Sequence, residues 1–153
     1  MASTEEAAVS ETERVVAILG GGQALGRAAP KTEFELIALV RKGVPYRALA
    51  KAKIALEVTT DDLSRFLHLK KRTLARRRGE QRLTAGESER LVRLARVAAR
   101  AEEVLGDRGS ALRWIRKPNR ALGNVPPIEL LDTDLGLEAV LNTLGRIEHG
   151  VFS

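Results

Sequence analysis

The sequence predicts an all-α protein, and two observations support that prediction. Helix-forming residues, above all Ala, Leu, Arg and Glu, dominate the 153-residue chain,. Apolar side chains recur at spacings of three and four, the period of a helix with one buried face, whereas Val and Ile are scattered instead of alternating with polar residues. A chain of this length buries roughly 70% of its unfolded surface, so it can fold without disulfides, and it contains no cysteine.

Residues 1–30 are expected to form a partly disordered N-terminal segment with one short helix over residues 11–19,. A run of three glycines ends that helix. The stretch from Gly21 to Ala28 nearly matches a phosphate-binding P-loop, but Arg27 and Ala28 stand where the motif requires Lys and Ser or Thr,. We therefore interpret the stretch as a helix stop followed by a turn.

Residues 31–105 are predicted to form one helical domain. Gly43 and Gly79 are typical helix ends, and Pro45 is a typical helix start,. Thr60 can cap the third helix of the domain, and Thr84 with Glu87 three residues later forms a capping box,. The expected helices cover residues 32–42, 46–57, 60–67, 71–78 and 84–105.

The longest of these helices, over residues 84–105, has a continuous apolar stripe at spacings of three and four,. Such a stripe is more typical of a core or a dimer surface than of a cofactor site. We expect part of it to contribute to a dimer interface. The residues assigned to that interface are Leu91, Leu94, Ala98 and Ala101.

Residues 106–153 are predicted to form a separate small helical module. A helix over residues 110–117 ends at Pro118, because the residue before proline avoids helical geometry,. A loop and a helical turn lead to Thr133, which can cap a final helix with an apolar stripe,. Gly150 ends this helix and leaves a short tail, Val151–Ser153.

The segment from residue 60 to residue 78 has the form of a helix-turn-helix. Leu63 and Leu67 can pack the first helix onto the second, and Ser64 supplies the small side chain that closely crossing helices need. The tight turn normally has glycine where this chain has His68, because the backbone there takes a positive φ. Lys70 replaces the usual hydroxyl cap of the second helix.

Positive charge is concentrated in this motif. Between Leu63 and Arg82 there are eight basic residues and one acidic residue, whereas the whole chain has a net charge of only +6. A basic helix of this width fits the major groove of DNA, where Arg and Lys read base edges or hold phosphates; the alternative is a solvated helix face. The expected DNA-contacting residues are Lys71, Arg72, Thr73, Arg76, Arg77 and Arg78.

Several other classes of protein fit the sequence poorly. The chain has no nucleophile–base set, and His68 and His149 are its only histidines, so we expect no catalysis, no metal site and no cofactor,. No apolar run approaches the roughly 18 residues that cross a membrane. These features, with the absence of cysteine, predict a cytoplasmic protein.

The C-terminal module resembles the Xre/MbcA/ParS-type antitoxin family, and residues 71–91 resemble that family's Xre-like helix-turn-helix. The resemblance covers about Leu36 to Ser153 and is most specific in the last third of the chain. There the matching residues fall in the family's order: Trp114, Pro118-Asn119, Ala121-Leu122-Gly123, Pro126, Leu130-Leu131 and Thr133.

The resemblance implies the antitoxin of a type II toxin–antitoxin system. It implies a toxin with a RES fold that consumes NAD or ADP-ribosylates a target, repression of the operon through operator DNA, and a homodimer. It also implies that the module neutralises the toxin, and we expect the end of the chain to block the toxin's active site. The residues assigned to toxin binding are His149, Gly150, Val151, Phe152 and Ser153.

A second interpretation stays open at this point. The chain could be a stand-alone helix-turn-helix repressor whose C-terminal module only dimerises or senses a signal. A toxin gene beside the chain's own gene would distinguish the antitoxin from the repressor.

Overall fold

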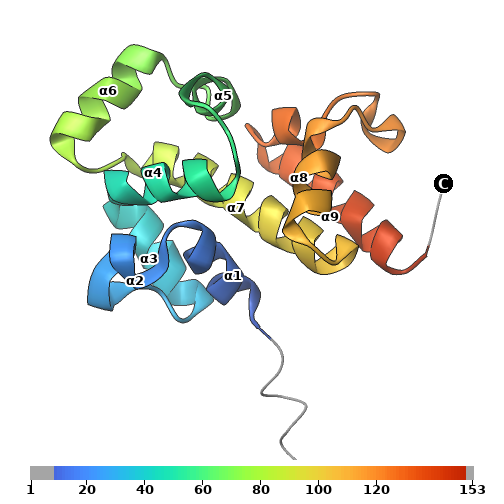
Figure 1. Cartoon of the computed structure of the whole chain (residues 1–153), viewed down its shortest axis with the longest axis horizontal. Coiled ribbons are helices and arrows are strands. Elements are labelled where there is room, and N and C mark those ends of the chain that lie inside the picture. Colours follow the sequence, from blue (N-terminus) through green and yellow to red (C-terminus); the bar gives the residue numbers. More distant parts are fainter. Residues whose placement is uncertain (1–8, 151–153) are drawn as a thin grey trace, which may run out of the picture.

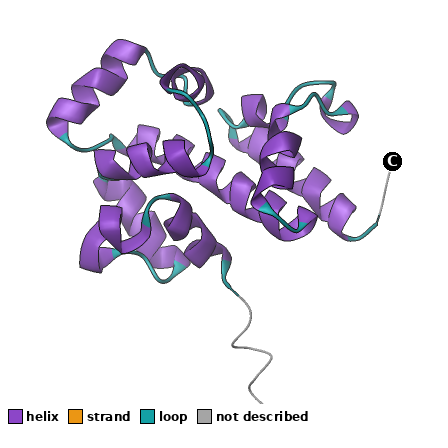
Figure 2. Cartoon of the chain, in the orientation of Figure 1, coloured by secondary structure: helices purple, strands orange, loops and turns teal. Residues whose placement is uncertain are grey.

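The computed structural model describes residues 9–150, and every regular element among them is helical (Figure 2). The all-α prediction is therefore confirmed. The α-helices are α1 (Glu11–Ile18), α2 (Gly21–Leu25), α3 (Glu33–Lys42), α4 (Tyr46–Ala55), α5 (Thr60–Phe66), α6 (Lys71–Glu80), α7 (Ala85–Leu105), α8 (Arg108–Arg116) and α9 (Asp134–Glu148). Short 3₁₀ turns are η2 (Gly26–Ala28), η3 (Arg120–Leu122) and η4 (Pro127–Leu130).

Side-chain caps fix most helix starts. Thr84 caps α7 and shares a capping box with Glu87, and Thr133 caps α9, both as predicted. The prediction for α5 was wrong by one residue: the cap is Thr59, whose hydroxyl accepts the Asp62 N–H while the Asp62 carboxylate accepts the Thr59 N–H. An acidic residue three positions after a threonine therefore marks the start of this helix too.

The long helix α7 is the centre of the fold, with α1 and α3 against its first half and α8 and α9 against its second half (Figure 1). Most of its apolar stripe is buried within the chain. Leu91, Leu94, Ala98 and Ala101 are all buried in the core, so the prediction that they form a dimer interface was wrong. A side chain already enclosed by its own chain has no surface left for a partner.

The N-terminal segment joins this core. Val15 and Ile18 on α1, with Leu19 and Ala24 after it, are buried, so residues 11–25 form part of the folded core. The short helix α2 was not expected, because three consecutive glycines favour a turn. Gly20 takes φ +99°, and a Cβ there would lie 2.6 Å from Cγ of Lys51 on α4, which explains why glycine is needed,.

A shared hydrophobic core and several side-chain hydrogen bonds cross the expected domain boundary at residue 105. The hydrophobic core runs without a break from α1 to α9. Arg108 donates to the carbonyl of Ala55 at 3.3 Å, and Arg116 donates to the carbonyl of Glu57 at 2.6 Å, so α8 holds the end of α4. Within residues 9–150, no helix has both the length and the apolar character that a membrane-crossing segment requires.

Candidate functional site

Helices α5 and α6 form the helix-turn-helix that the sequence predicts. Leu63 and Leu74, one on each helix, are buried between them and the rest of the core. His68 in the turn takes φ +52°, the left-handed conformation expected where such turns usually place glycine,. The hydroxyl of Ser64 donates to the carbonyl of Leu69, which fastens the end of the turn to the first helix.

Four of the six predicted DNA-contacting residues on α6 are exposed basic side chains: Lys71, Arg72, Arg76 and Arg78. Lys71 pairs with Asp61, and Arg76 lies 3.7 Å from the carboxylate of Glu80. Arg72 and Arg78 have no ion pair with any residue between positions 9 and 150. Thr73 is partly buried. The second helix therefore presents a basic, solvent-facing side that is suited to a polyanion.

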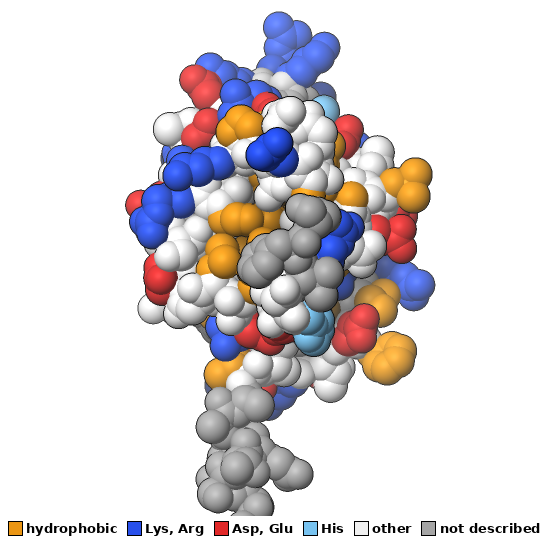
Figure 3. Space-filling view, turned by 90° about the vertical axis from the view of Figure 1, so that its right-hand side faces the viewer, with side chains coloured by type: hydrophobic (Ala, Val, Ile, Leu, Met, Phe, Trp, Pro, Cys, Tyr) orange, Lys and Arg blue, Asp and Glu red, His pale blue; other side chains and the backbone are white. Residues whose placement is uncertain are grey.

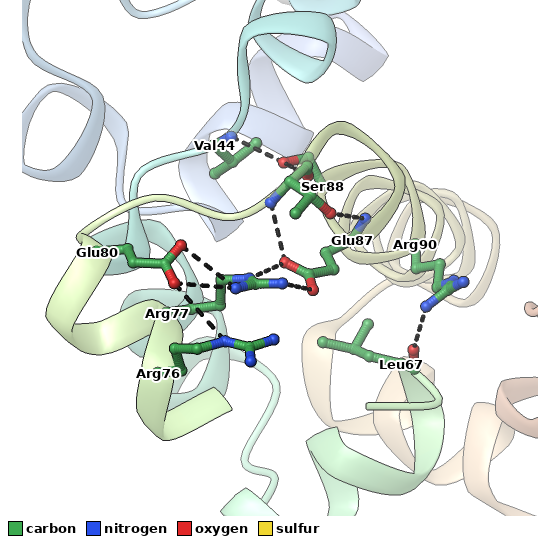
Figure 4. A network of polar contacts seen from close by, with 9 residues as sticks. Val44, Leu67, Arg76, Arg77, Glu80, Glu87, Ser88 and Arg90 are labelled. Atoms are coloured by element: carbon green, nitrogen blue, oxygen red, sulfur yellow. Dashed lines mark hydrogen bonds and ion pairs between the residues drawn. The ribbon is translucent and has the colours of Figure 1, made fainter. Parts of the chain in front are cut away.

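Arg77 lies differently from its neighbours, because its side chain is only 11% exposed. Its Nε donates to Oε1 of Glu87 at 2.7 Å and its Nη2 donates to Oε2 at 3.0 Å, a two-bond pair between α6 and the start of α7 (Figure 4). Its Nη1 donates to Glu80 at 3.3 Å. A guanidinium held in this way positions the helix and has few N–H groups left for DNA.

The Glu87 carboxylate is the buried partner of this pair. Burial by itself raises the pKa of the Glu87 carboxyl, but the hydrogen bonds from Arg77 and from the backbone N–H of Thr84 outweigh it, and the pKa lies below its ordinary value. The hydrogen bond with Glu87 also raises the pKa of Arg77. Both groups are therefore charged at neutral pH, and α6 is fastened to α7 by a charged, two-bond contact.

Further polar contacts hold the motif against α7. The backbone N–H of Val44 donates to the Ser88 hydroxyl at 2.8 Å, and Arg90 donates to the carbonyl of Leu67 at 3.1 Å (Figure 4). One contact therefore reaches the chain just before α4 and the other reaches the turn between α5 and α6. The helix-turn-helix, and with it the basic side of α6, is therefore held against the first two turns of α7.

The C-terminal module packs on the other half of α7. Trp114 lies partly buried on α8 against the core. Asn119 organises the following loop: its side chain accepts the N–H of Ala121 at 2.9 Å, and its own N–H donates to Val125 at 3.2 Å. Gly123 takes φ +70° in the same loop. Trp114, Asn119 and Gly123, which are among the residues that fall in the family's order, thus lie at the core or shape the loop.

The predicted toxin-binding tail begins at the end of α9. His149 is the exposed C-cap of α9, and Gly150 has φ +72°. Val151, Phe152 and Ser153 lie outside the described residues. Figure 3 looks onto the C-terminal module and shows apolar side chains at the surface near the middle of that face, with Lys and Arg side chains both beside them and at the edges. Among residues 9–150, no three His, Asp or Glu side chains are placed to hold a metal ion.

Comparison with known sequences matches two parts of the chain to two domain families. Residues 35–96 match the antitoxin Xre-like helix-turn-helix domain, which here corresponds to α3 through the first half of α7. Residues 100–150 match the antitoxin Xre/MbcA/ParS C-terminal toxin-binding domain, which covers the end of α7 together with α8 and α9.

Whole-chain relatives agree with these matches. An Antitoxin Xre of Photorhabdus laumondii is 36% identical over 120 residues, which cover 77% of this chain and 81% of the relative. An Antitoxin Xre of Yersinia enterocolitica is 33% identical over the same coverage. A protein of a Sphingobium species named Prs ADP-ribosylating antitoxin is 32% identical over 141 residues, or 86% of this chain and 87% of that protein. The chain therefore belongs to the Xre/MbcA/ParS family of antitoxins.

Proposed function

We propose that this antitoxin neutralises a RES-fold toxin and represses their shared operon, acting in the cytoplasm where that operon lies. The exposed basic face of α6, presented by a complete helix-turn-helix, is the observation that supports DNA binding most strongly. The match of residues 100–150 to a toxin-binding domain supports the second activity. The name of the Sphingobium relative, Prs ADP-ribosylating antitoxin, favours a toxin that uses NAD as its substrate.

The DNA-binding activity uses the exposed side chains of α6. Arg72, Arg76 and Arg78 can reach base edges or phosphates, because α6 has the width of the major groove. Arg77 positions α6 through Glu87 and leaves direct contact to the other side chains. A short motif of this kind reads one half-site, so a homodimer on a two-fold repeat is the expected assembly.

The toxin-binding activity uses the C-terminal module and the residues that follow it. His149 and Gly150 end α9, and three further residues reach at most about 10 Å when extended, which is long enough to enter a pocket beside the docking surface. Phe152 supplies apolar area with few rotatable bonds, and the Ser153 hydroxyl can replace a ligand oxygen,. We infer that this tail, His149–Ser153, blocks the toxin's active site.

Expression with the neighbouring gene tests the proposal. The product of that gene is expected to arrest growth when it is expressed alone, to permit growth when this chain is co-expressed, and to co-purify with it. The purified chain is expected to shift a DNA fragment from its own promoter. Promoter binding without any effect on the neighbouring gene product would instead identify a stand-alone repressor.

A further inference from the structure

Residues far apart in the sequence meet beside the C-terminal end of α6. The N–H of Tyr46 donates to the carbonyl of Gln81 at 2.9 Å, and the N–H of Leu83 donates to the carbonyl of Val44 at 2.9 Å. These two antiparallel bonds hold the start of α4 next to the end of α6. Gly43 permits this close approach with φ +102°, since a Cβ there would collide with the Leu83 carbonyl.

Three arginines surround the hollow that this pairing creates. Arg47 comes from α4, Arg78 from α6, and Arg82 from the segment after α6, and all three are exposed. They line a surface hollow of about 720 Å³ together with Tyr46 and the carboxylate of Glu80. Glu80 already lies 3.3 Å from Arg77 and 3.7 Å from Arg76, so its negative charge is compensated within α6.

The guanidinium groups are available for a ligand to different degrees. Arg82 uses its Nη1 to donate to the Gly43 carbonyl at 2.6 Å, which orients the group and leaves its other N–H groups free of any ion pair within residues 9–150. Arg47 and Arg78 have no ion pair there either. The N-terminus of α4 adds the positive end of its helix dipole to the hollow, and the N-cap residue, Pro45, has no side chain that caps it,.

This chemistry matches a phosphodiester. Guanidinium groups bind phosphate oxygens through two parallel hydrogen bonds, and several of them around one hollow attract a polyanion before contact. The hollow adjoins the end of α6, and a helix in the major groove is flanked by the sugar-phosphate backbone. The DNA backbone is therefore the ligand that both the charge and the position of this hollow favour.

We propose that Arg47, Arg78 and Arg82 form a second DNA contact, which grips the backbone phosphates that flank the major groove. The proposal rests on the proposed DNA-binding function and adds Arg47 and Arg82 to it. Phosphate contacts fix the register of a recognition helix without reading sequence. The hollow would therefore orient α6, while Arg72 and Arg76 would discriminate among bases.

Binding to two duplexes over a salt series tests this contact. The probes are a duplex from the chain's own promoter and a scrambled duplex of equal length and composition, with the full chain as wild type and as Arg47→Ala. We expect the variant to lose about five- to tenfold in affinity for both duplexes near 0.1 M salt, and the salt slope to fall by about one. Arg146→Ala, which removes the same charge from exposed α9, is the control and is expected to leave both quantities unchanged.

The outcomes separate this contact from the proposed function. If wild type binds neither duplex, DNA binding itself is contradicted. If Arg72→Ala weakens promoter binding while Arg47→Ala and Arg78→Ala change neither affinity nor slope, DNA binding stands and the second contact is wrong. A change in preference between the duplexes with Arg47→Ala would also overturn it, since a phosphate contact carries no sequence information. Arg47→Lys, expected to retain most affinity, and thermal melting of each variant exclude misfolding as the cause.

Discussion

Arg76 and Arg77 are adjacent arginines, but one side chain faces solvent and the other is held in an ion pair between two helices. Arg77 follows Leu74 by three positions, so it shares the inward side of α6 and meets Glu87, whereas Arg76 faces solvent,. Spacing from the buried leucine alone does not set Arg77 apart, because Arg78 follows Leu74 by four positions and is exposed,. The identity of the partner of Arg77 depends on how α7 folds back against α6, and no local pattern contains that information.

Arg72 and Arg76 are the residues we expect to read bases. Replacing either with Ala should weaken specific binding by about 1–3 kcal/mol if its side chain makes a bidentate contact to guanine. Affinity for the promoter duplex and for the scrambled duplex, measured with each variant, checks this prediction. Equal affinities for wild type and both variants would show that α6 is not the recognition helix.

The Arg77–Glu87 pair predicts a pH-dependent stability. Because folding lowers the pKa of Glu87, the pair's contribution is fully present above the ordinary glutamate pKa of about 4.3 and is lost as the pH falls through the folded-state value. We expect Glu87→Gln to unfold at a lower urea concentration than wild type at pH 7. The difference between the two midpoints should shrink as the pH falls below about 4. Urea titrations at pH 7, 5 and 3 measure it. A difference that is constant across this range would contradict the role of the carboxylate.

Among the helices, most ends could be predicted from capping residues and glycines close to them in the sequence. Thr84, Thr133 and Gly43 each act within a few residues of themselves, so their positions could be recognised from sequence alone. α2 and the hollow around Arg47 could not be predicted. α2 depends on packing against α4, and the hollow depends on a pairing between residues 43–46 and 81–83.

Residues 151–153, after α9, are predicted to be needed for toxin inhibition but not for folding. Deleting Val151–Ser153 should leave the melting temperature and promoter binding unchanged, because the buried stripe of α9 lies before it. Inhibition of the toxin should weaken sharply, since the part that enters the pocket is gone. A toxicity assay at matched expression measures this, with Phe152→Ala as a single-residue comparison. Full protection by the truncated chain would transfer the inhibitory role to the body of the module.

In the whole molecule, α7 joins the helix-turn-helix and the C-terminal module into one body. Because its apolar stripe is buried, a dimer interface would have to lie on another surface. A groove of about 570 Å³ lies between α1, α3 and the start of α7, and it is lined by apolar residues that include Leu36, Ile37 and Val40. Phe34, on α3, is 82% exposed. Acidic and basic side chains both border the groove, among them Glu33 and Arg41, so the same patch on two copies offers both signs of charge for an isologous contact.

We therefore expect the dimer to form through α3. Wild type should have a dimeric mass by light scattering at micromolar concentration, and Phe34→Asp should shift it toward the monomer while leaving the helical content unchanged. Ile54→Asp, at another exposed apolar position, is the matched control and should stay dimeric. A dimeric Phe34→Asp protein would place the interface on another surface.

Inhibition of the purified neighbouring gene product measures whether the C-terminal module neutralises a toxin independently of DNA binding. The NAD-consuming activity that we propose for the neighbouring gene product is titrated with wild type, with Arg72→Ala and with the chain lacking Val151–Ser153. We predict that wild type and Arg72→Ala inhibit equally at near-stoichiometric concentrations and that the truncated chain inhibits weakly. If the wild-type chain neither binds nor inhibits that protein at any ratio, the chain is not its antitoxin.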